Sequence, residues 1–208
     1  MDGHLVGRLL QEDRPVRGVD VKPTAKWHQV FHEADNVVVD LKHPDACKEI
    51  CQGVSDLYNL ASDMGGMGFL EKNKALCMLS VLINTNLLQA ALEASVERFF
   101  FASSACVYSP ANVQEKDLVL FREEHAYPAM PLDGYGWEKL FSERMCRHFR
   151  EDFGLKTYVA RFNNIYGPYN VWEGGRERVD AALCRKIIDA VRRGQNEIEI
   201  WGDGRQQR

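Results

Sequence analysis

The sequence has little excess charge of either sign and no long uncharged apolar run. Its 208 residues contain 26 Lys and Arg against 30 Asp and Glu, a formal net charge of −4. So small a negative charge gives no electrostatic basis for binding nucleic acid or an anionic membrane. The longest apolar runs fall short of a membrane span and carry charges, so we expect no transmembrane segment.

The sequence also lacks the cysteine spacing of a zinc site and a recognisable export signal. Its six cysteines form no Cys-x-x-Cys pair, and Cys47 and Cys51 have no pair of histidines nearby at zinc spacing. The first residues, Met-Asp-Gly-His, are not the basic and apolar stretches that begin a signal peptide. We therefore expect reduced thiols and a cytoplasmic protein.

Strand and helix patterns alternate along a chain whose 45% hydrophobic content is enough for a core. Strands are predicted at residues 16–21, 36–41, 57–61, 98–102, 156–161 and 197–201. Helices are predicted at residues 5–11, 44–51, 76–93, 135–149 and 180–193. This alternation predicts an α/β fold with a mostly parallel sheet, whose ligands bind beyond the carboxyl ends of the strands.

Small and polar residues follow three of the predicted strands. A glycine-rich loop at residues 63–69 comes after the strand at 57–61, and Ser103-Ser104-Ala105-Cys106 comes after the strand at 98–102. An Asn-Asn-Ile-Tyr-Gly-Pro segment at residues 163–168 follows the strand at 156–161. Because parallel strands end at the same edge of a sheet, we expect these segments to form the binding edge.

Tyr135 and Lys139 form the only Tyr-x-x-x-Lys in the chain. Residues four apart share a helix face, and a lysine ammonium beside a phenol lowers the tyrosine pKa. Such a tyrosine can accept the proton of a substrate hydroxyl while hydride leaves the same carbon. Ser104 is placed to hydrogen-bond the reacting oxygen. The alternatives are a partly buried tyrosine beside a solvated lysine, and a turn-forming serine.

Asp20 and Asp40 stand at the ends of two successive predicted strands. An acidic residue at such an end suits the two ribose hydroxyls of an adenosine and repels a 2′-phosphate. This favours NAD over NADP, although Lys22 lies close by, and Asp40 is placed to approach the adenine. A lone aspartate at a strand end is more often a turn residue, so that interpretation stays open.

Four stretches resemble the extended short-chain dehydrogenase/reductases, the family of NAD-dependent nucleotide-sugar epimerases and dehydratases. They are residues 63–69, 103–108, 174–178 and 182–186. Within the family, the methionine-glycine loop and Cys106 are most similar to the GDP-mannose 3,5-epimerase group, and the resemblance covers nearly the whole chain.

The resemblance implies a Rossmann-like, doubly wound, mostly parallel sheet. Residues 1–165 would be the NAD-binding domain, incomplete at its N-terminus, and residues 166–208 the start of an incomplete substrate-binding region. The first strand and the glycine-rich loop of that fold are not found in the sequence. This strand normally lies in the middle of the sheet, so we expect two unpaired strand edges.

The resemblance also implies a reaction on a GDP-hexose. Oxidation at C4 makes the C3 and C5 protons acidic, and reduction of the ketone afterwards recycles NAD. Tyr135, Lys139 and Ser104 would perform the redox steps, and Cys106 and Arg178 would be the acid/base pair. Cys106 has a simpler interpretation as a small buried side chain. Family members are usually dimers through two helices, one of them the Tyr135 helix.

The family match further implies two sets of ligand contacts. Those to NAD would be Asp20, Asp40, Leu41, Leu60, Ala61, Ser80, Tyr135 and Lys139. Those to the nucleotide sugar would be Gly65, Ser104, Asn164, Glu177, Lys186, Gln206 and Arg208.

Arg178 is the main departure from the family pattern, which has a lysine there as the acid opposite the cysteine. Arginine stays protonated at ordinary pH, so it can stabilise an enolate but is a poor proton donor. Two other interpretations therefore stay open. One is another nucleotide-sugar 4-epimerase or 4,6-dehydratase. The other is a truncated, non-catalytic remnant that binds a partner through exposed sheet edges.

Overall fold

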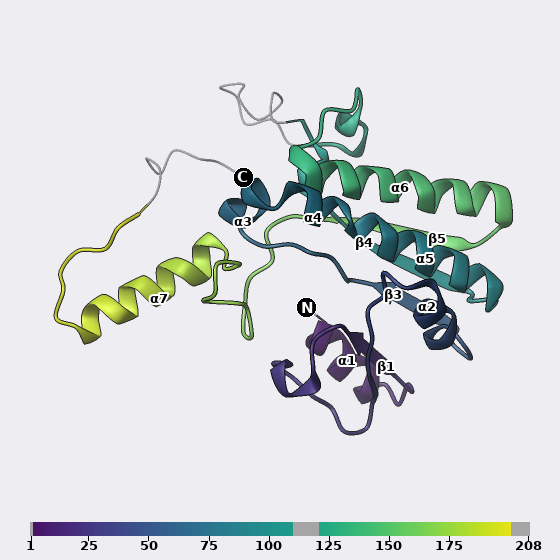
Figure 1. Cartoon of the computed structure of the whole chain (residues 1–208), viewed down its shortest axis with the longest axis horizontal. Helices are drawn as coiled ribbons and strands as arrows, with labels where there is room; N and C mark the ends of the chain where they lie inside the picture. Colours follow the sequence, from purple (N-terminus) through teal and green to yellow (C-terminus); the bar gives the residue numbers. More distant parts are fainter. Residues whose placement is uncertain (1, 110–120, 201–208) are drawn as a thin grey trace.

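The computed structural model describes residues 2–109 and 121–200, and within them strands and helices alternate as predicted (Figure 1). β1 (Arg17–Asp20) pairs with β2 (Asp35–Val38). β4 (Arg98–Ser104) lies between β3 (Asp56–Asn59) and β5 (Lys156–Phe162). Every pair is parallel, which confirms the predicted sheet type.

The strands form two sheets, because no strand of the described ranges lies between β1 and β3. One edge of each of these two strands is therefore unpaired. The sheets still share a core, since Val19 and Val37 pack against the same apolar cluster as Phe99 and Phe101. The two phenylalanines are fully buried at alternate positions of β4, as a strand covered by helices requires.

The α-helices of the described ranges are α1 (Asp2–Gln11), α2 (Pro44–Ile50), α3 (Met67–Lys72), α4 (Lys74–Met78), α5 (Ser80–Glu93), α6 (Asp133–Phe153) and α7 (Val179–Arg192). Short 3-10 turns include η1 (Thr24–Lys26), η2 (Ala105–Val107) and η4 (Glu123–Ala126). Helices α5 and α6 lie side by side along the three-stranded sheet (Figure 1). α6 ends before Gly154, whose φ of 75° gives the left-handed cap that favours glycine.

Three predictions about these elements were wrong. The helix expected at residues 76–93 is two helices, because the chain leaves one and starts the other at Leu79. Helix α3 forms within and after the glycine loop, where no element was predicted. Residues 197–200 form no strand, because no described strand pairs with them, and Trp201 lies outside the described residues.

The run Lys74–Glu93 is long and apolar enough to cross a membrane by length and composition, contrary to the expectation from the sequence. Half of it is buried inside the protein. Leu87, Leu88 and Ala91 of α5 are almost fully covered by the core that includes Phe99 and Phe101. The apolar composition of this run is therefore explained by its packing as a core helix.

Candidate active site

The segments that follow β3 and β4 meet the start of α6 at the carboxyl edge of the three-stranded sheet. Cys106 on η2, Tyr135 on α6, and Met67 and Phe69 on α3 pack in one small apolar cluster with Leu70 and Cys77. This confirms the expectation that the glycine loop and the Ser-Ser-Ala-Cys segment lie together. The asparagine segment after β5 joins them through Asn164, described below.

Tyr135 is placed by a close contact between α6 and η2. The N–H of Leu132 donates to the carbonyl oxygen of Cys106 at 2.9 Å. A Cβ added at Gly136 would lie 2.3 Å from that same oxygen, so a side chain there would push the helix away. Tyr135 is consequently buried, with 7% of its surface exposed, and the Ser104 side chain lies close enough to act on the pKa of its hydroxyl.

The predicted lowering of the Tyr135 pKa is wrong for this structure. Burial raises the pKa of the Tyr135 hydroxyl, and the acidic groups of Cys106 and Glu138 raise it further. The Ser104 hydroxyl and the charge of Arg178 oppose this rise. Lys139 Nζ lies 5.5 Å from the Tyr135 ring centroid, over the ring face. The two side chains thus share a face, but burial and the neighbouring acidic groups outweigh the Ser104 and Arg178 effects.

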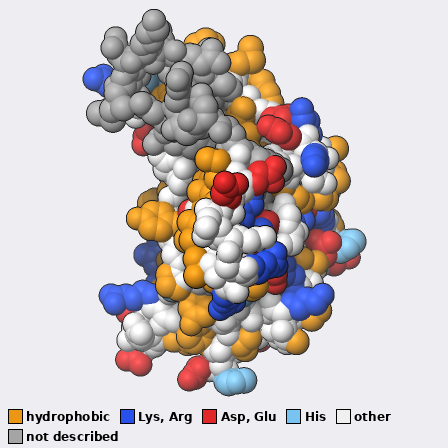
Figure 2. Space-filling model, turned by 90° about the vertical axis from the view of Figure 1, so that its left-hand side faces the viewer, with side chains coloured by type: hydrophobic (Ala, Val, Ile, Leu, Met, Phe, Trp, Pro, Cys, Tyr) orange, Lys and Arg blue, Asp and Glu red, His pale blue; other side chains and the backbone are white. Residues whose placement is uncertain are grey.

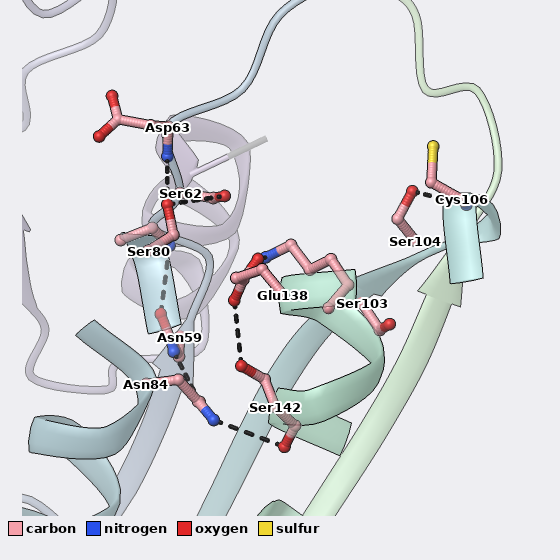
Figure 3. A network of polar contacts seen from close by, with 12 residues as sticks. Asn59, Ser62, Asp63, Ser80, Asn84, Ser103, Ser104, Cys106, Glu138 and Ser142 are labelled. Carbon is pink, nitrogen blue, oxygen red and sulfur yellow. Dashed lines mark hydrogen bonds and ion pairs between the residues drawn. The ribbon is translucent and has the colours of Figure 1, made fainter. Parts of the chain in front are cut away.

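Ser104 and Cys106 lie next to each other where β4 ends (Figure 3). The backbone N–H of Cys106 donates to Ser104 Oγ at 3.2 Å, which starts the η2 turn. Cys106 is partly exposed, whereas Cys77 in the same cluster is fully buried. Cys106 is therefore not a fully buried side chain, although it packs against this cluster. All six cysteines are free, as predicted.

The glycine loop is fixed to the segment that carries Glu177 and Arg178. The N–H of Gly66 donates to the carbonyl of Arg176 at 3.1 Å. A Cβ on Gly66 would be 2.4 Å from the carbonyl oxygen of Glu177, so only glycine permits this approach. The Arg176 guanidinium lies 4.0 Å from the Phe69 ring centroid. The roles of Gly66 and Arg176 were missed, because both arise from a contact across 110 residues of chain.

Arg178 comes to the site from the residue before α7. Its guanidinium donates to the side-chain oxygen of Asn164, and its charge acts on Tyr135. Glu177 accepts from the N–H of Gly175 at 2.6 Å. Three predicted sugar contacts, Gly65, Asn164 and Glu177, thus lie in the segments that adjoin this cluster.

The last predicted sugar contacts lie further along the chain. Lys186 is on α7, where Nζ donates to the carbonyl of Glu199 at 2.7 Å. Gln206 and Arg208 lie outside the described residues. A pocket of about 520 Å³ between residues 166–172 and α7 is lined by neither Tyr135 nor Cys106, so it is separate from the cluster. The molecular face turned toward the viewer in Figure 2 mixes hydrophobic with charged side chains.

The predicted cofactor residues follow the ends of β1, β2 and β3. Asp20 is the last residue of β1 and accepts from the N–H of Lys22 at 2.8 Å through Oδ1. Asp40 accepts from the N–H of Lys42 at 2.9 Å in the same way. Both aspartates are therefore turn residues, and each turn uses only one carboxylate oxygen.

The remaining predicted cofactor positions lie near the end of β3. Leu60 and Ala61 follow this strand, and the N–H of Ala61 donates to the Asn59 side chain at 3.3 Å. Ser80 begins α5, and its hydroxyl accepts from the N–H of Asp63 at 2.9 Å (Figure 3). In the sequence these positions lie between the two aspartates and Cys106.

Comparison of sequences identifies relatives along the whole chain. The model of the NAD dependent epimerase/dehydratase family matches residues 2–208. GDP-mannose 3,5-epimerase of Arabidopsis thaliana is 40% identical over 206 residues, covering 99% of this chain and 54% of that protein. GDP-mannose 3,5-epimerase 1 of Oryza sativa subsp. japonica is 42% identical over 206 residues. The match covers 99% of this chain and 53% of that protein. The chain spans about half the length of the curated relatives it matches.

Solved structures confirm the Rossmann-like α/β fold. UDP-glucose 4-epimerase of Thermotoga maritima, solved with UDP-glucose, has a TM-score of 0.79 at 21% identity and covers 97% of this chain and 62% of that chain. MoeE5, solved in complex with UDP-glucose and NAD, has a TM-score of 0.69 at 29% identity. The match covers 98% of this chain and 61% of the MoeE5 chain. The first likeness shows the fold alone, because its identity is low.

Proposed function

The chain belongs to the NAD-dependent epimerase/dehydratase family, and on this basis we propose that it acts on a GDP-hexose in the manner of a GDP-mannose 3,5-epimerase. The reaction is a transient oxidation at C4, inversion at C3 and C5, and reduction of the ketone. The observation that carries the proposal is the cluster of Ser104, Cys106 and Tyr135 with the charge of Arg178 acting on it.

The residues at the strand ends fit NAD, the cofactor of the family. Asp20 and Asp40 each have a carboxylate oxygen outside the turn contact, which suits ribose hydroxyls and adenine. Leu41, Leu60, Ala61 and Ser80 continue this row toward Tyr135 and Lys139. Bound NAD would accept the hydride from C4 and return it after epimerisation.

Tyr135 and Ser104 perform the proton transfer of the redox steps in this proposal. Ser104 acts on the pKa of the Tyr135 hydroxyl, so a sugar C4 hydroxyl placed between the two side chains could hydrogen-bond both. Tyr135 in its phenolate form, which the charge of Arg178 favours, takes the C4 proton during oxidation and gives it back during reduction. Lys139 supplies a positive charge over the Tyr135 ring, at 5.5 Å from its centroid.

Cys106 removes the C3 and C5 protons once the ketone has formed. Cys106 is partly exposed and lies beside Ser104, so the base and the redox groups could act on the same sugar. Arg178 stabilises the enolate by its charge, and because a guanidinium does not release a proton, the proton that inverts each carbon would come from solvent water, while the proton on Cys106 is lost to solvent. Gly65, Asn164, Glu177 and Lys186 hold the nucleotide sugar, with Gln206 and Arg208 assigned the same role by family resemblance.

The test uses the purified chain as it stands. We expect bound NAD, detected by absorbance after release, and deuterium wash-in at C3 and C5 of GDP-mannose. Cys106→Ala is expected to lower wash-in by about 10²- to 10⁴-fold, the range for loss of a general base. Cys184→Ala, on exposed α7, is the matched control and should retain wash-in. Undiminished wash-in in Cys106→Ala would rule out Cys106 as the base that removes the C3 and C5 protons. Absence of bound NAD would favour the alternative that the chain is a non-catalytic remnant.

A second candidate is a nucleotide-sugar 4-epimerase or 4,6-dehydratase, favoured by arginine at position 178. The same wash-in experiment distinguishes the 4-epimerase. A 4-epimerase converts UDP-glucose with inversion at C4 and leaves C3 and C5 without solvent deuterium.

We also propose a cytoplasmic homodimer that pairs through α5 and α6. Four large apolar residues on these helices have 41–56% of their surface exposed. They are Met78 at the end of α4, Leu82 on α5, and Trp137 and Phe141 on α6. Each pair is four residues apart and so presents one continuous face. Such a face matches the helix pair through which the family dimerises.

Phe141→Glu is therefore expected to give a monomer, because a charge in an apolar interface has no partner. Light scattering after size exclusion should show the mass fall from twice 23.8 kDa to 23.8 kDa. Phe153→Glu is the control, since Phe153 is as exposed as Phe141 but lies about 120° around α6. Equal masses for the two variants would place the interface elsewhere.

A further inference from the structure

Lys139 is an ammonium held almost entirely out of water. Its side chain is 4% exposed, and its neighbour Glu138 is 1% exposed. Lys139 Nζ lies 3.6 Å from Glu138 Oε2, 4.7 Å from the Phe101 ring centroid and 5.5 Å from that of Tyr135. A cation is attracted to aromatic faces, but only an opposite charge compensates the loss of its hydration.

Glu138 is fixed by a buried polar network that joins α5 and α6 (Figure 3). Ser142 Oγ donates to Glu138 Oε1 at 3.0 Å. Asn84 Nδ2 donates to the carbonyl of Ser142 at 3.5 Å, and Asn59 Nδ2 donates to Asn84 Oδ1 at 3.0 Å. Glu138 Oε2 has no hydrogen-bond partner in the described part of the chain. One carboxylate oxygen is thus anchored, and the other is left for Lys139.

We infer that Glu138 is a positioning residue, the counter-ion that keeps the Lys139 ammonium charged and fixed over Phe101 and Tyr135. Its use in catalysis rests on the function proposed above, in which Lys139 supplies positive charge beside the proton-accepting Tyr135. A glutamate immediately before the lysine gave no signal in the sequence, because its burial depends on how α6 packs on β4.

The other titratable groups around the pair stay neutral near pH 7. Tyr135 and Cys146 of α6 and Cys77 of α4 face Glu138 or Lys139. Burial raises the pKa of Cys146 to about 12 and also raises those of Tyr135 and Cys77. Burial also raises the pKa of Glu138, and the Lys139 charge opposes that rise, so Lys139 is the group whose charge responds to moderate alkali.

The sign of the pH dependence follows from the buried lysine. Burial lowers the pKa of Lys139 below its ordinary value of 10.5, and the Glu138 charge opposes that change. In Glu138→Gln the opposing charge is gone, so the folded-state pKa falls further. At pH values between this lowered folded-state pKa and 10.5, the unfolded variant binds more protons than the folded variant. The free energy of unfolding of Glu138→Gln therefore rises with pH in this range. The stability lost at neutral pH is thus recovered as Lys139 deprotonates.

The test is the Tm of the full chain between pH 6 and pH 10. Glu138→Gln should lower the Tm at pH 7 by roughly 10 °C, since a buried charge has lost its partner. That deficit should shrink by at least about half by pH 10. Glu143→Gln is the matched control on the same helix, because its partner Arg161 keeps its proton throughout this range. Its deficit should be the same at every pH.

A second variant keeps the inference testable if Glu138→Gln does not fold. The double variant Glu138→Gln with Lys139→Met removes both charges and should melt at or above the wild-type Tm. The inference would be overturned if the Tm deficit of Glu138→Gln did not change with pH. It would also be overturned if the double variant melted at a lower temperature than Glu138→Gln. Melting is measured without substrate, so failure of NAD retention or wash-in would reject the proposed reaction and leave this result standing.

Discussion

Replacing Tyr135 with phenylalanine is expected to lower deuterium wash-in at C3 and C5 of GDP-mannose by about 10²- to 10⁴-fold. Wash-in requires the C4 ketone, and the ketone forms only if the C4 hydroxyl gives up its proton. Phenylalanine keeps the ring that packs with Leu70 and Cys77, so the fold and the NAD-facing surface are retained. The loss therefore reports on the hydroxyl itself. Mass spectrometry of the recovered sugar nucleotide measures it.

The control for this variant is Tyr108→Phe. The Tyr108 hydroxyl accepts a hydrogen bond from Arg161 at 3.2 Å, and its ring packs against Val107 and Leu140 outside the Tyr135 cluster. We expect Tyr108→Phe to retain wash-in and to lose only some stability. If the two variants retain wash-in equally, the role assigned to Tyr135 is wrong, even if Cys106→Ala is inactive.

The sequence was sufficient for features that depend on local pattern. The run of phenylalanines at 99–101 identified β4, because a buried strand of a parallel sheet is apolar at nearly every position. The spacing of Tyr135 and Lys139 placed both on one face of α6, and the glycines at 65 and 66 marked the loop that contacts Glu177. In each case the residue types themselves determine the local geometry.

Features that depend on distant contacts could not be predicted. The break at Leu79 and the lack of a strand at 197–200 follow from which neighbours are present to pack or pair. The Tyr135 pKa was predicted in the wrong direction because a charge four residues away is visible in the sequence, whereas burial is not. The same limitation concealed Glu138, which resembles a solvated helix residue until α6 is seen against Phe101.

The other large expected effect is on stability. Glu143→Ala should lower the free energy of unfolding by about 3–5 kcal/mol, the cost of removing one partner of a buried ion pair. Glu143 is 9% exposed, and its carboxylate accepts from Arg161 at 2.7 Å and from the Ser103 hydroxyl. It thereby joins α6 to β5 and β4. Without it, Arg161 stays charged, because a guanidinium does not deprotonate at ordinary pH.

Urea unfolding at pH 7 measures this loss, with Glu151→Ala as the control on the same helix. Glu151 is exposed and pairs with the exposed Arg147, so its removal should have little effect on stability. Because Ser103 is bonded to Glu143 and precedes Ser104, Glu143→Ala should also loosen the end of β4, where the hydroxyl and thiol of the proposed site are held. Wash-in should then fall together with stability in Glu143→Ala but not in Glu151→Ala. Equal unfolding curves for the two variants would show that the Glu143 and Arg161 pair does not hold the strand end in place.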